Sequence, residues 1–167
     1  MTRQEPWLRG PIEGVHPLLM PIAHSLTQVI EDLPDAVGGI AAEKLWEKPG
    51  GSASIGFHLK HIASSLDRLY TYARGEKLTE QQLATLKSEK EDDARTLEEL
   101  LKETLVQLEL SLQQLRLANH ETLHNTRYVG RAQLPSTQLA LLYHGAEHAQ
   151  RHLGALIATA KVVRSSE

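Results

Sequence analysis

Leucines recur every three or four residues through the stretch 97–115 of this 167-residue chain. They are Leu97, Leu101, Leu105, Leu108, Leu112 and Leu115. This spacing places apolar side chains along one face of an α-helix and leaves the opposite face polar. Thr96 and Glu99 have the spacing of a capping box, which pairs free backbone N–H groups in the first turn of a helix. The stretch is therefore predicted to be a long helix that packs through its leucine face.

Three other segments show the same helical spacing of apolar residues. These segments and a short additional helix are expected over about 17–33, 55–74, 136–163 and 79–90. Gly75 ends the second segment, and Ser136 is the expected N-cap of the last one. No window alternates with the period of two that marks a half-buried strand. We predict an all-α four-helix bundle with short additional helices in the connections, because neighbouring helices of similar length favour packing within one chain.

The chain is long enough for one domain that buries a core without covalent cross-links. We expect an N-terminal arm over 1–15, a helical domain over 16–163 and a polar tail over 164–167. There is no cysteine, which excludes cysteine-ligated zinc, a thiol nucleophile and disulfides. A metal bound to such a domain would therefore serve function rather than hold the fold together.

Charge and hydropathy narrow the expected partners. The chain has 18 Lys and Arg against 21 Asp and Glu, a formal net charge of -3, and no basic cluster. Nucleic acid is therefore not an expected partner. The N-terminal segment lacks the apolar stretch of a signal peptide, and no apolar run is long enough to span a membrane. We expect a cytoplasmic protein that does not bind membranes.

Three histidines, His144, His148 and His152, recur at a spacing of four within the last predicted helix. Side chains four residues apart lie one turn apart on nearly the same face, so two imidazoles can bind one metal ion. Histidine pairs also occur on plain helix surfaces, so a third ligand from elsewhere is needed to indicate a metal site. Counted around the helix, His152 lies nearest the apolar face and His144 almost opposite it, which makes His144 the expected surface residue.

The second predicted helix offers two candidates for the third ligand, His58 and His61. At about 100° per residue, His58 lies roughly 60° and His61 roughly 120° from the centre of the apolar face. Periodicity alone therefore favours His58.

The segments HIASSLDRL and EHAQRHLGAL resemble the DinB/YfiT-like family of small four-helix-bundle proteins, which are proposed metalloenzymes. In that family a histidine on the second helix joins an H-x-x-x-H pair on the last helix, commonly continued as H-x-G-Q. The resemblance implies that His61, His148 and His152 are the metal ligands, and His58 remains the alternative to His61. Ala155 stands where the family usually has glutamine, a departure that leaves the ligands unchanged.

Three histidines leave a divalent ion with at least one open position, because a closed structural zinc site usually has four protein ligands. An open site can activate water for hydrolysis or bind a thiolate as a Lewis acid. The resemblance implies hydrolases, or thiol transferases that use low-molecular-weight thiols such as bacillithiol or mycothiol, and it implies a homodimer.

We therefore expect a hydrolase or thiol transferase that acts on a small molecule. Zinc or nickel is the expected metal, because three imidazoles suit both ions. The alternative is a non-catalytic helical binding or assembly module that happens to carry histidines.

Two motifs in the chain match the sequence patterns of known zinc sites. His120 and His124 bracket an H-E-x-x-H pattern, but they lie where the helical periodicity fades, so we interpret the pattern as chance. His144 and His148 bracket H-x-x-E-H, whose fold needs a further ligand well downstream, and only 19 residues follow His148. Glu147 within it is either an acceptor that orients a ligand imidazole or a solvated helix residue, and both interpretations stay open.

Overall fold

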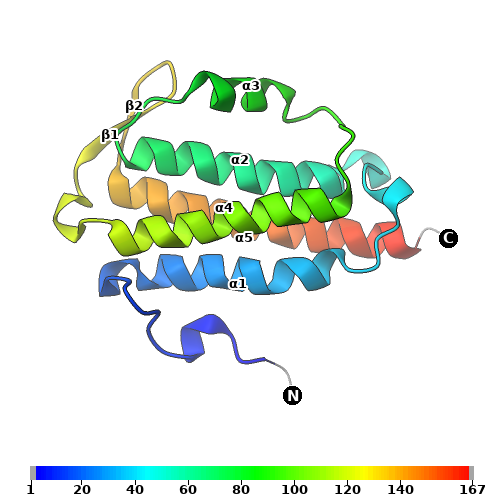
Figure 1. Cartoon of the computed structure of the whole chain (residues 1–167), viewed down its shortest axis with the longest axis horizontal. Helices are drawn as coiled ribbons and strands as arrows, with labels where there is room; N and C mark the ends of the chain where they lie inside the picture. Colours follow the sequence, from blue (N-terminus) through cyan, green and yellow to red (C-terminus); the bar gives the residue numbers. More distant parts are fainter. Residues whose placement is uncertain (1–2, 166–167) are drawn as a thin grey trace.

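The computed structural model describes residues 3–165 and shows a bundle of four long helices (Figure 1). These are α1 (Met20–Val37), α2 (Ile55–Ala73), α4 (Leu97–Leu117) and α5 (Gln138–Ser165). The short helix α3 (Glu80–Ser88) runs alongside α2. Single 3-10 turns span Pro6–Leu8, Pro17–Leu19, Ala42–Lys44, Pro49–Gly51 and His120–Thr122. The prediction of an all-α four-helix bundle with short extra helices is confirmed.

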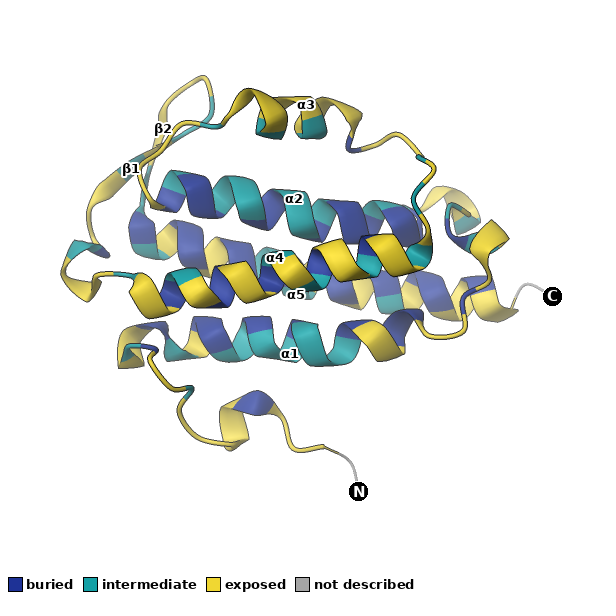
Figure 2. Ribbon diagram, viewed as in Figure 1, coloured by how far each residue is buried: buried dark blue, intermediate teal, exposed yellow. Residues whose placement is uncertain are grey.

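The four long helices form a closed ring in the order α1, α5, α2, α4, since each contacts its two neighbours in that order. Figure 2 shows that their buried residues face inward, whereas α3 is largely exposed. The core is aliphatic, and Leu26, Leu59, Leu66, Leu108 and Leu142 are fully buried within it. Within residues 3–165, no helix is both long and apolar enough to cross a membrane.

Both predicted capping boxes are present, at Thr79 and at Thr96. The predicted end of the first helix at Leu33 was wrong, because α1 continues through Pro34 to Val37. Val37 is buried against the bundle, and this packing favours a further helical turn despite the N–H that proline lacks. Of the predicted polar tail 164–167, the first two residues belong to α5, and the last two lie outside the described residues, as do the first two of the arm.

A small antiparallel hairpin joins α4 to α5 and was not predicted. Its strands are β1 (Thr126–Val129) and β2 (Leu134–Thr137), with Thr126 opposite Thr137. Their sequences, TRYV and LPST, do not alternate between apolar and polar residues, so they lack the pattern that indicates a half-buried strand. The predicted cap at Ser136 was also one residue early, because Ser136 lies in β2 and the Ala140 N–H donates to Thr137 Oγ1 at 3.1 Å.

Gly145 lets α5 lie close to α2. A Cβ atom at this position would be 2.7 Å from Cε2 of Tyr70, a ring that is only 1% exposed. We expect Gly145→Ala to lower the free energy of unfolding by about 1–3 kcal/mol, because the buried ring has little room to move.

Gly154→Ala is the matched control on the same helix, since its Cβ would meet no atom within 4 Å. It should leave stability unchanged or raise it by up to about 1 kcal/mol through helix propensity. Urea denaturation measures both variants, and equal losses would contradict the assigned role of Gly145.

Candidate metal centre

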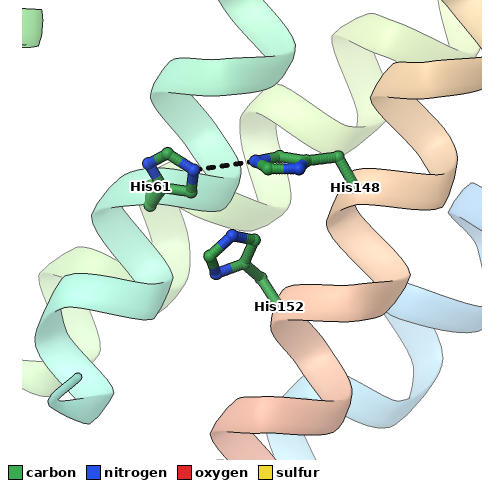
Figure 3. A group of neighbouring side chains, drawn as sticks. All are labelled: His61, His148 and His152. Atoms are coloured by element: carbon green, nitrogen blue, oxygen red, sulfur yellow. Dashed lines mark hydrogen bonds between the residues drawn. The ribbon is translucent and has the colours of Figure 1, made fainter. Parts of the chain in front are cut away.

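Histidines from α2 and α5 converge where these two helices lie side by side (Figure 3). One nitrogen from each of His61, His148 and His152 lies within 4.8 Å of the other two. Their ring centroids are 4.4–4.9 Å apart. In the described part of the chain, this is the one group of three or more histidine or acidic side chains close enough to share an ion. The structure therefore brings together the three residues that the family resemblance implied as ligands.

The local sequence explains why these rings meet at the edge of the core. Each of the three histidines directly precedes a core residue, and these residues are Ile62, Ala149 and Leu153, all at most 3% exposed. Because neighbouring helical side chains point about 100° apart, a buried residue turns the preceding one toward the boundary between core and solvent. The three histidines are accordingly half-buried, at a depth where a metal ion and a small molecule can both reach them.

The ring nitrogens have an arrangement that suits one ion. Nε2 of His61 lies 2.7 Å from Nε2 of His148. Nδ1 of His152 lies 3.0 Å from Nδ1 of His58, which leaves Nε2 of His152 for a metal. Nitrogens on one tetrahedral zinc ion are about 3.3 Å apart, given bond lengths of about 2.0–2.1 Å. Small ring rotations would therefore accommodate an ion.

The electrostatic environment keeps His58, His148 and His152 neutral near pH 7. Burial, reinforced by the neighbouring His61, lowers the pKa of His148 to about 4 and that of His152 to about 3. Burial and His61 also lower the pKa of His58 to about 4. Because the neutral imidazole is the form that binds metals, the two α5 histidines need not lose a proton to bind an ion near pH 7.

Glu89, just after α3, faces the outer side of His61 and was missed by sequence reasoning. Its Oε2 lies 3.0 Å from Nδ1 of His61, although the ring N–H does not point at the oxygen closely enough for a hydrogen bond. Burial raises the pKa of Glu89, but contacts with His61, Ser64 and Arg68 outweigh it and hold the pKa at about 2. Glu89 stands in a polar run from Lys87 to Asp93, where nothing in the sequence distinguishes it.

The shifted pKa values predict how stability depends on pH. His58, His148 and His152 titrate below their ordinary value of 6.5, so the metal-free folded chain binds fewer protons than the unfolded chain between about pH 4 and 6.5. Its free energy of unfolding should therefore rise with pH through this window and level off above it. Glu89 adds a loss of stability in the same direction as the pH falls from 4.5 toward 2.

Thermal melts of metal-free protein across this pH range measure the effect. A variant with all three of these histidines replaced by glutamine should lose most of the slope between about pH 4 and 6.5 and keep the loss at lower pH. A slope that persists unchanged in this variant would show that other groups cause it.

The remaining residues of the two zinc-like sequence motifs lie outside the cluster of His61, His148 and His152. The side chain of His144 is 49% exposed, as expected of a surface residue. The Glu147 carboxylate contacts Arg151 and His144, which supports its interpretation as a solvated helix residue. His120 stacks on His16 with ring centroids 4.3 Å apart and belongs to a 3-10 turn. The α-helix that the H-E-x-x-H zinc motif requires is therefore absent there.

A comparison with protein families identifies the family of this chain. No curated protein matches the chain. A family model described as the DinB superfamily matches residues 25–156. The matched region takes in α2 and α4, most of α1 and α5, and all three clustered histidines. The chain therefore belongs to the DinB superfamily.

Proposed function

We propose that the protein is a divalent-metal-dependent enzyme of the DinB-like class, acting as a hydrolase or a thiol transferase on a small molecule. The observation that carries the proposal is the cluster of His61, His148 and His152, whose ligand nitrogens lie within 4.8 Å of one another. Neutral imidazoles are ligands for zinc and nickel, and three of them leave part of the coordination shell open. When bound, the ion would supply Lewis-acid chemistry that activates water or a low-molecular-weight thiol.

The chain's own residues would orient the ligands. For Nε2 of His152 to bind an ion, its proton must sit on Nδ1, where it can be donated to Nδ1 of His58 at 3.0 Å. His58 then carries its own proton on Nε2. The most buried of the four rings, at 4% exposure, thus holds the tautomer of a ligand rather than binding the ion itself.

Phe57 provides an apolar wall beside the cluster. Its ring stacks on His61 with centroids 5.3 Å apart and an interplanar angle of 13°. It also lies 6.3 Å from the ring of His152. An aromatic face at this position limits the access of water to one side of the histidines and offers a contact for the apolar part of a substrate.

Metal content is the decisive measurement. Protein purified without a histidine tag and without added metal should contain, or take up, about one equivalent of zinc or nickel by plasma mass spectrometry, as one mononuclear site requires. Hydrolytic and thiol-transfer substrates would then be screened with the loaded and the metal-free protein. Failure to take up zinc, nickel or manganese would favour the alternative, a non-catalytic helical binding or assembly module.

We also propose a homodimer, for which the outer face of α4 is the candidate surface. Val106, Leu110 and Leu117 are 52%, 52% and 77% exposed on this helix. Their spacing of four and seven places them along one helical stripe. Light scattering that gives the mass of a single chain would contradict the dimer.

A further inference from the structure

The connection between α2 and α4 lies on the bundle in an unusual way. This connection, residues 75–96, includes α3 and is called the α3 strap below. All of its residues are described, and Glu89 is the one that is buried, at 6% exposure. Leu83 and Leu86 of α3 remain 45% and 44% exposed. Acidic residues are rarely buried without a specific partner, so a strap that buries a carboxylate and leaves leucines outside calls for an explanation.

The partner of Glu89 is a polar stripe on α2. His61, Ser64 and Arg68 follow one another at spacings of three and four, so they share one face of the helix. Arg68 Nη1 donates to Glu89 Oε1 at 3.0 Å, and the Ser64 hydroxyl donates to the same oxygen. The other oxygen, Oε2, lies 3.0 Å from Nδ1 of His61. Arg68 and Ser64 thus fix one carboxylate oxygen and present the second one to the histidine.

We propose that Glu89 is a positioning residue of the metal centre and that it links the α3 strap to metal binding. The inference rests on the proposed function, because it requires His61 to be a ligand. The His61 N–H is not aligned on Oε2, but at 3.0 Å a small rotation of the ring would complete the hydrogen bond. A carboxylate bonded to Nδ1 in this way holds the proton there, directs Nε2 toward the ion and makes the ring a stronger electron-pair donor. Since coupling between two binding equilibria is reciprocal, a bound ion should in turn hold the strap more firmly through Glu89.

The strap has a second anchor on α2 that does not involve Glu89. Nζ of Lys60 lies 2.5 Å from the carbonyl oxygen of Glu91 and 2.9 Å from Asp93. Lys60 is 8% exposed, and its ammonium group stands 5.5 Å from the centre of the Trp46 ring. Variants of Glu89 should therefore keep the strap on α2, so an effect on metal binding can be separated from a loss of structure.

The test compares Glu89→Gln and Glu89→Ala with Glu91→Gln. The control removes the same charge from an exposed side chain of the same strap. Zinc titrations should give dissociation constants about ten- to a hundredfold higher for the Glu89 variants and a near-unchanged value for the control. With cobalt as a spectroscopic probe at saturation, the visible bands should shift in Glu89→Gln and not in Glu91→Gln, because only Glu89 contacts a ligand.

Hydrogen exchange tests the reciprocal effect. Zinc should slow amide exchange over residues 80–93 in the unaltered protein, and this slowing should be lost in Glu89→Gln. Circular dichroism would verify that each variant is folded, and Glu89→Gln carries the test if Glu89→Ala is not.

Three outcomes would overturn the inference or its basis. If the unaltered protein binds zinc and both Glu89 variants bind it equally well, the role of Glu89 is wrong and the proposed function stands. If Glu91→Gln weakens binding as much as Glu89→Gln, a general effect of charge replaces the specific contact. If the unaltered protein binds no metal, the proposed function itself fails.

Discussion

Protein carrying His148→Ala is expected to lose its metal and keep its fold. Nε2 of His148 lies 2.7 Å from Nε2 of His61, so both nitrogens would contact the same ion. Replacing a residue that hydrogen-bonds to a metal ligand typically weakens metal affinity about ten- to a hundredfold, so replacing a ligand itself should weaken it by more than about a hundredfold. The side chain is only half-buried and lies outside the aliphatic core, so alanine should cause little loss of stability in the metal-free fold. Zinc titration and a thermal melt measure the two effects.

His144→Ala is the matched control for this substitution. It makes the same change one turn earlier on α5, in an exposed ring 5.4 Å from that of His148. The control should bind zinc within a few-fold of the unaltered protein. Retention of metal by His148→Ala would show that this residue is not a ligand, and equal losses in both variants would show that the loss does not come from removal of a specific ligand.

Replacing the two α2 histidines, His58 and His61, in separate variants decides which of them is the third metal ligand. His61→Ala should lose the metal as His148→Ala does. His58→Ala should retain it with weaker affinity, because His58 acts only through Nδ1 of His152. The reverse result would make His58 the ligand.

The choice between these two histidines shows what periodicity can and cannot predict. A helical wheel measures how directly a side chain points at the core, and it correctly places His58 deeper than His61. A ligand that must also meet a substrate belongs at the edge of the core, where a second helix can reach it. The resemblance to the DinB/YfiT-like family, and not periodicity, predicted His61 as the ligand, and the structure places it beside His148 and His152.

Local pattern predicted the long helices well and the connections poorly. The leucines of α4 and the capping boxes at Thr79 and Thr96 depend on neighbours within a few residues. The contact between Glu89 and His61 joins residues that are far apart in the chain, and it depends on the path of the α3 strap. No period or motif encodes such a path, so the carboxylate could be found only in three dimensions.

Zinc or nickel is expected to raise the melting temperature of the metal-free protein. The folded chain presents nitrogens from His61 and His148, which are 87 residues apart, whereas the unfolded chain would have to close that loop to bind. An ion at about one hundred times its dissociation constant then stabilises the fold by about 2.7 kcal/mol. For a domain of this size that corresponds to a shift of about 5–10 °C.

Much of this shift should persist below neutral pH, which separates this site from an exposed histidine pair. Because the pKa values of His148 and His152 are lowered to about 4 and 3, protons do not compete for these two rings until the pH falls well below 6.5. An exposed pair with ordinary pKa values would instead lose the ion near pH 6.5. Melts with zinc and with a chelator, repeated at about pH 7.5 and 5.5, make the comparison. A shift of equal size in His148→Ala would place the stabilising ion elsewhere on the protein.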